Sequence, residues 1–180
     1  NIIMIGEIRD EETAQIAARA AITGHLVLST IHTNDAVGVV ARLVNMKVPR
    51  YLVADSLLGS ISQRLVRRLC PHCKEKKMTD IQETKILQLD APQEIYHPKG
   101  CRYCNGTGYI GRLGLFEIML TSKAIRNAIM DENITGQQLE DIANKEGKTT
   151  LLEEAKKKVL DGEISIEEYE KLSEFVDRDD

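Results

Sequence analysis

The chain has 180 residues, of which 42% are hydrophobic and 29% charged, and its formal net charge is −4 at pH 7. These values are typical of a globular protein with room for one domain or two small ones. No apolar run approaches the roughly 20 residues needed to cross a bilayer. The acidic balance and the 4% aromatic content argue against a nucleic acid as ligand.

The stretch from residue 2 to residue 34 predicts a strand, a helix and a second strand. Residues 2–5 and 26–30 are short apolar runs, the pattern of buried parallel strands. Glu7 follows the first run and His32 follows the second. Because the carboxyl ends of parallel strands meet at one edge of a sheet, we expect Glu7 and His32 to face the same crevice. A carboxylate and an imidazole at that edge suit chemistry on a metal-bound phosphate.

Local signals predict where the next elements begin and end. Asp10 is placed to cap the helix between the two strands, and Gly24 to end it in the left-handed conformation. Further elements are expected before the first cysteine, namely a helix capped by Thr33 or Asn34, a short helix over residues 51–58 and a strand over residues 61–69.

The four cysteines fall in two CxxC pairs separated by 27 residues: Cys70 with Cys73, and Cys101 with Cys104. Two such turns supply four thiolates in a tetrahedral arrangement, which suits a structural Zn²⁺ ion. A disulfide scaffold would need an oxidising compartment, which nothing in the sequence indicates. His72, inside the first pair, is expected to be an exposed loop residue and not a ligand. We expect the metal to replace a hydrophobic core that the intervening loop lacks.

The remainder predicts mainly helices. A helix is expected near residues 81–89, and the glycines at 106, 108, 111 and 114 predict turns that lead into a strand over residues 115–119. Ser122 is placed to cap a helix that runs towards Met130. Capping-box spacing recurs three times in the tail, at Thr135 with Gln138, at Thr150 with Glu153 and at Ser165 with Glu168.

Three motifs together resemble one family. Residues 3–13 (IMIGEIRDEET) are similar to the Walker B motif, and residues 23–34 (TGHLVLSTIHTN) to the histidine box, of the type II/type IV secretion ATPase superfamily. Residues 63–73 and 101–112 resemble the tetracysteine segment of its assembly branch, which pilus-retraction relatives lack. The specific match covers roughly residues 1–120.

The resemblance implies a fold, roles and partners. The fold would be α/β: the C-terminal half of a RecA-like P-loop NTPase domain, an inserted tetracysteine zinc subdomain and a C-terminal helical region. Glu7 would hold Mg²⁺ through water or orient the attacking water, and His32 would contact the γ-phosphate of ATP. His25 is expected to be structural. Arg9 and Asp10 would act locally, as a salt-bridging group and a helix cap.

The family works as a homo-hexamer on the inner face of the cytoplasmic membrane, beside an inner-membrane platform protein. The implied domains are an ATPase core over residues 1–69, a zinc subdomain over 70–114 and a helical subdomain over 115–180. The sequence has no initiator Met and begins within a strand, so we expect a C-terminal piece whose Walker A loop lies upstream and which alone does not hydrolyse ATP. The alternatives are a zinc-ribbon adaptor without catalysis and a nucleic-acid-binding zinc protein.

Overall fold

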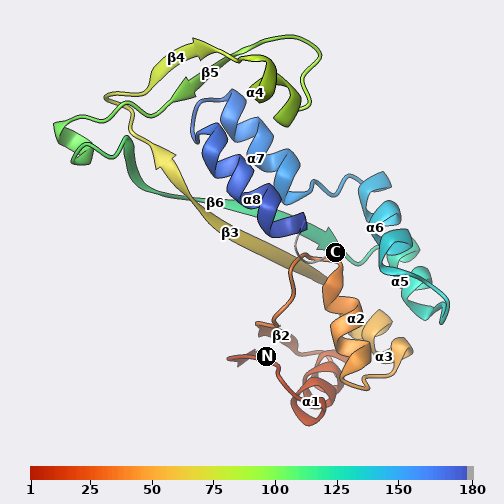
Figure 1. Cartoon of the computed structure of the whole chain (residues 1–180). Coiled ribbons are helices and arrows are strands. Elements are labelled where there is room, and N and C mark those ends of the chain that lie inside the picture. The colour runs from red at the N-terminus through yellow and green to blue at the C-terminus, as the bar shows by residue number, and fades with distance from the viewer. Residues whose placement is uncertain (178–180) are drawn as a thin grey trace. The chain divides into compact units, whose positions relative to one another are not determined.

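The computed structural model describes residues 1–177, so the last three residues of the predicted helical subdomain lie outside the described part (Figure 1). The chain is mixed α/β, which confirms the predicted class. In chain order the elements are β1 Ile2–Ile5, α1 Glu11–Ile22, β2 Leu26–Ser29, α2 Gly38–Asn45, α3 Arg50–Ser56, β3 Gly59–Leu69, β4 Glu75–Met78, α4 Ile81–Ile86, β5 Glu94–His97, the 3-10 turn η1 Arg102–Cys104, β6 Tyr109–Leu120, α5 Lys123–Met130, α6 Gly136–Lys145, α7 Leu151–Leu160 and α8 Ile166–Asp177.

The chain forms two compact units, each built from two separate segments. The first unit combines Asn1–Ser62 with Glu117–Thr149, and the second combines Gln63–Phe116 with the chain from Thr150 onward. The paired strands β3 and β6 each contribute residues to both units. Helices α5 and α6 belong to the first unit, and α7 and α8 to the second. The three domains expected from the sequence stay a prediction.

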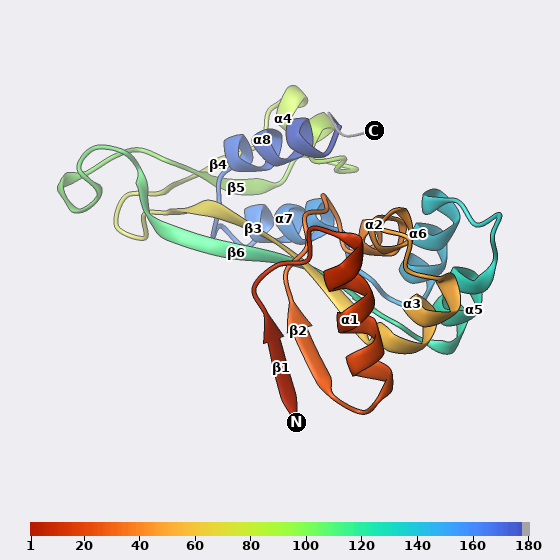
Figure 2. The same ribbon diagram turned by 90° about the horizontal axis from the view of Figure 1, so that it is seen from below.

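The first unit begins with the predicted strand–helix–strand arrangement. β1 and β2 pair in parallel, with Ile5 opposite Ser29, and α1 lies beside them (Figure 2). Asp10 caps α1 by accepting the N–H of Thr13 at 2.8 Å, as expected. Gly24 follows the helix with a φ of +97°, in the left-handed region that glycine adopts without a Cβ clash.

The expectation that these strands are buried is wrong for one face of the pair within the described residues. One face of the β1–β2 pair is exposed and carries four apolar side chains: Ile2, Met4, Leu26 and Leu28. The other face carries Ile5 and Val27, which pack against the core of the first unit. A helix on one side of two strands covers only the face of the strands that lies towards it.

Helices α2, α3, α5 and α6 complete the first unit. α3 packs against α1, α2 and α5, and α5 packs against α6. Their contacts enclose a hydrophobic core whose completely buried side chains include Val53, Ala54 and Ile129. Ser122 caps α5 by accepting the N–H of Ile125, as the sequence indicated.

The predicted start of α2 is wrong. Neither Thr33 nor Asn34 caps it, because the helix begins four residues later, at Gly38. Asp35 Oδ1 accepts the N–H of Gly38 at 2.5 Å, while Ser62 Oγ donates to the carbonyl of Asn34. Residues 30–37 are therefore held as a loop by Asp35 within it and by Ser62, which is distant in sequence.

The second unit packs α7 against α8 and against β5 of an antiparallel hairpin formed by β4 and β5. Its core gathers apolar side chains from strands, hairpin and helices, including the completely buried Leu87, Ile95, Leu115 and Val159. The hairpin is therefore fixed by hydrophobic contacts of its own. The expectation that the loop between the cysteine pairs lacks a core is wrong.

Two of the three predicted capping boxes in the tail are confirmed. Thr135 with Gln138 and Thr150 with Glu153 exchange both capping hydrogen bonds. In the third predicted box, Ser165 with Glu168, the Glu168 carboxylate contacts Arg67. The predicted turns at Gly111 and Gly114 are also wrong, because β6 begins at Tyr109 and runs through both glycines.

Among residues 1–177, no helix combines the length and the apolar character that crossing a bilayer requires.

Candidate functional site

The ends of β1 and β2 continue side by side beyond the strands themselves. The Ile8 N–H donates to the carbonyl of Thr30 at 2.9 Å, and the Thr30 hydroxyl donates to the carbonyl of Gly6 at 2.8 Å. These two bonds hold the segment that carries Glu7 against the segment that carries His32. The predicted common edge is therefore present in the structure.

At that edge, the Glu7 and His32 side chains meet. His32 Nε2 lies 2.7 Å from Glu7 Oε1, while the other carboxylate oxygen, Oε2, accepts a hydrogen bond from Arg9 Nε at 2.6 Å. The side chain of His32 is 82% exposed and that of Glu7 is 20% exposed. The imidazole is thus open to an incoming ligand, whereas the carboxylate is held in place by its neighbours.

The surroundings of Glu7 favour its charged form. The hydrogen bond from Arg9 holds the pKa of the Glu7 carboxyl below its usual range, and the charges of Arg9 and His32 act in the same direction. Despite the short distance to His32, Glu7 Oε1 accepts no well-directed hydrogen bond within the described residues. A buried carboxylate oxygen with an unused lone pair suits a metal-bound water, because buried polar atoms otherwise find partners.

The neighbouring polar residues have the local contacts that were expected of them. Arg9 pairs with Glu7, and Asp10 caps α1. His25 lies at the start of β2, at the opposite end from His32, and its Nδ1 is 3.4 Å from the Thr23 hydroxyl.

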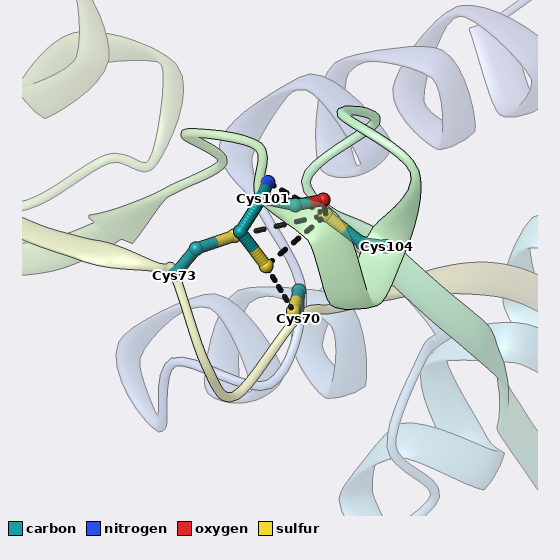
Figure 3. A group of neighbouring side chains, drawn as sticks. All are labelled: Cys70, Cys73, Cys101 and Cys104. Atoms are coloured by element: carbon teal, nitrogen blue, oxygen red, sulfur yellow. Dashed lines mark hydrogen bonds between the residues drawn. The ribbon is translucent and has the colours of Figure 1, made fainter.

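The four cysteines come together in the second unit, from the turn after β3 and from η1 (Figure 3). Their Sγ atoms all lie within 4.8 Å of one another. Three of the sulfur pairs are closer, with Cys70–Cys101 at 3.9 Å, Cys73–Cys104 at 3.8 Å and Cys101–Cys104 at 3.7 Å. A tetrahedron with metal–sulfur bonds of ~2.3 Å has edges of about 3.8 Å. The donor set therefore fits one tetrahedral metal ion.

Backbone amides point at these sulfurs. The N–H groups of Cys101 and Gly108 donate to Cys104 Sγ at 3.1 and 3.2 Å. Burial alone would raise the pKa of the Cys104 thiol, but these donors lower it to about 6. Desolvation raises the pKa of the Cys73 thiol to about 12. Amide donors of this kind orient and stabilise thiolate ligands once a metal is bound.

His72 does not belong to the cysteine group. It lies in the first CxxC turn, and its ring stacks on Tyr103 with centroids 4.3 Å apart.

One buried carboxylate that contacts the His32 loop was not identified from the sequence. Glu117 interrupts the apolar run of β6, and its Oε1 accepts the N–H of Ala36, in the loop that carries His32, at 2.8 Å. A single Glu within an otherwise apolar strand is the signal that could have identified it.

The fold is shared with a solved ATPase. The X-ray structure of the Yersinia pseudotuberculosis ATPase DotB matches with a TM-score of 0.65 and 21% sequence identity, over 97% of this chain and 37% of that chain. The Legionella pneumophila ATPase DotB gives the same TM-score and identity, over 95% and 38%. The chain therefore has the fold of part of a DotB-type ATPase.

Residues 1–171 match the family described as Type II/IV secretion system protein, and the chain belongs to that family, as its motifs indicated. The Type IV pilus assembly ATPase TfpB of Acinetobacter baylyi is 44% identical over 173 residues, which cover 93% of this chain and 29% of that protein. The Type II secretion system protein E of Pseudomonas aeruginosa is 42% identical over 170 residues, covering 93% and 34%. The chain thus spans about a third of the length of these relatives.

Proposed function

We propose that the chain is the C-terminal part of a cytoplasmic, hexameric ATPase that powers type II secretion or type IV pilus assembly. It would supply the Walker B carboxylate, the histidine box and the tetracysteine segment to the C-terminal half of a RecA-like domain. The Walker A loop would lie in the part of the relatives that this chain does not span, so the chain alone would not hydrolyse ATP. Its partners would be five further copies and an inner-membrane platform protein.

The observation that carries this proposal is the contact between Glu7 and His32 at the shared end of two parallel strands. When bound with ATP, Mg²⁺ would neutralise phosphate charge. Glu7, held ionised by Arg9, would accept a hydrogen bond from a metal-bound or attacking water. His32, exposed and attached to the neighbouring strand, would contact the γ-phosphate. An adaptor without catalysis leaves this pair unexplained.

We further propose that the metal is Zn²⁺ and that its role is structural. Cys70, Cys73, Cys101 and Cys104 would fill a tetrahedral shell, which leaves no open position for substrate or water. The four sulfurs therefore suit an ion that joins the end of β3 to η1.

The proposed ATPase role is tested by Glu7→Gln and His32→Ala in the full-length protein. Each change should lower ATP turnover by roughly 100-fold or more, since positioned acid–base and phosphate contacts contribute on this scale. Binding of a fluorescent ATP analogue should change by less than about threefold. The matched controls are Glu12→Gln, an exposed carboxylate in the first turn of α1, and His25→Ala. Normal turnover by Glu7→Gln would overturn the assignment.

A further inference from the structure

We propose that Glu117 is a positioning residue, which holds the loop that carries His32, and that Lys148 is the counter-charge that allows a carboxylate to do so inside the core. This inference rests on the function proposed above. It concerns three residues of the first unit that no motif includes: Glu117 in β6, Lys148 after α6 and Ala36 in the His32 loop.

The first step is the burial of the charges. The side chain of Lys148 is 2% exposed and that of Glu117 is 5% exposed, and Lys148 Nζ lies 3.3 Å from Glu117 Oε1. Lys148 Nζ also lies 2.5 Å from Glu140 Oε1, on α6. Ions taken out of water are costly unless they are paired and hydrogen-bonded. A hydrophobic residue would fill the position of Glu117 more cheaply, so the carboxylate needs a reason beyond packing.

The second step is what Glu117 contacts. Its Oε1 accepts the N–H of Ala36 at 2.8 Å, and Ser60 Oγ donates to the carbonyl of the same residue at 2.5 Å. Both backbone polar groups of the buried Ala36 are therefore satisfied by side chains from β3 and β6. Val37, which caps α2, provides no side-chain hydrogen bond to the helix. Asp35 inside the loop bonds the first N–H of α2, while Ala36 is held from outside the loop by Glu117 and Ser60.

The third step is the position of His32 between two anchors. At one end of its loop, Thr30 is bonded to Gly6 and Ile8, next to Glu7. At the other end, Ala36 is bonded to Glu117 and Ser60. The His32 side chain is itself largely exposed and contacts Glu7 at its tip. Releasing the second anchor would let the imidazole drift from the carboxylate, and small displacements of catalytic groups are costly to the rate.

The decisive comparison uses two double variants of the full-length ATPase, each of which removes the charges of Glu117 and Lys148. Glu117→Met with Lys148→Met removes both charges and the acceptor for the Ala36 N–H. Glu117→Gln with Lys148→Met removes both charges but keeps a carbonyl acceptor. In the Met/Met double variant, we expect kcat to fall about 10-fold, while the KM for ATP stays within about twofold of the parental value. In the Gln/Met double variant, we expect kcat to stay within about threefold of the parental value.

A merely structural role is separated by repeating the Met/Met pair in the His32→Ala background. If Glu117 acts through His32, the pair should lower kcat no further there. A parental kcat in the Met/Met pair, or an equal 10-fold loss with and without His32, overturns the inference. If the Met/Met double variant does not fold, the kcat of Ser60→Ala is compared with and without His32 instead. That variant releases the Ala36 carbonyl and should lower kcat about threefold only when His32 is present.

The same data distinguish this inference from the function on which it rests. Normal turnover by His32→Ala would refute the proposed function, regardless of the result for Glu117. If His32→Ala has impaired turnover but the Met/Met double variant has the parental kcat, only the positioning role of Glu117 is refuted.

Discussion

Cys101→Ser tests whether the tetracysteine site stabilises the second unit. The variant should lose the metal, because three thiolates and a hydroxyl form a far weaker zinc shell than four thiolates. The metal-bound set joins Cys70 to Cys101, which are 31 positions apart. In the chain-entropy model, closing a loop of this length is worth about 3–4 kcal/mol. We expect a loss of that order in the free energy of unfolding of the second unit.

The expected loss is far below the roughly 10–16 kcal/mol with which zinc binding folds isolated zinc-finger peptides. The reason is that Leu87 and Ile95, both between the cysteine pairs, are completely buried in the core of the second unit. The β4–β5 hairpin should therefore stay docked without metal while the cysteine turns loosen. For a unit of this size, ~3–4 kcal/mol corresponds to a Tm lowered by roughly 12–32 °C.

The assay combines metal analysis with thermal unfolding and amide hydrogen exchange of the full-length protein. The parent should carry one zinc per chain and Cys101→Ser close to none, with β4 and β5 still protected from exchange. His72→Ala is the matched control, since this residue lies in a CxxC turn and its ring stacks on Tyr103. An unchanged Tm after complete metal removal would refute the argument, and loss of protection throughout the hairpin would refute the separate hydrophobic anchoring.

Two further predictions concern stability. Burial alone would raise the pKa of the Glu168 carboxyl, but hydrogen bonds from Arg67 and Lys171 bring it below the ordinary value of 4.5. Glu168 therefore stabilises the protein above that value, and its contribution is lost as the pH falls through the lowered pKa. Glu168→Gln should cost about 1–3 kcal/mol at pH 7 by chemical denaturation. The difference in the free energy of unfolding between this variant and the parent should shrink below about pH 4.5. A difference that does not change with pH would contradict the ion pair. Asp10→Ala should cost about 1 kcal/mol through loss of the α1 cap. Glu12→Ala, in the same turn, should cost less, and equal losses would contradict capping.

The features that the sequence predicted correctly are local or follow from strand direction. The Asp10 cap and the capping boxes depend on residues three positions apart, which a sequence displays directly. The meeting of Glu7 with His32 depends on one further assumption, that two short apolar runs pair in parallel. The cysteine group follows from spacing because two CxxC turns bring four sulfurs into the arrangement of a tetrahedral metal shell.

The features that the sequence did not predict depend on contacts between distant segments. The loop before α2 is held by Asp35, which bonds Gly38, and by two distant side chains, Ser62 and Glu117, of which Glu117 is 81 positions from its partner Ala36. The docking of the hairpin depends on β5, which contains Ile95, packing against α7, and no local pattern reveals this contact. The length of β6 was missed because Gly111 and Gly114 suggested turns, whereas pairing with β3 holds them in a strand.

Among the described residues, a buried glutamate joins the two chain segments in each unit. In the first unit, Glu117 of the later segment accepts the N–H of Ala36 in the earlier one and pairs with Lys148. In the second unit, Glu168 of the later segment accepts the N–H of Arg67 in the earlier one, at 2.9 Å, and pairs with its guanidinium. Apolar contacts alone would let such segments slide, since hydrophobic attraction is non-directional. A charged acceptor aimed at one amide has a single best geometry, so these carboxylates fix the register of each unit and, through Ala36, the place of His32.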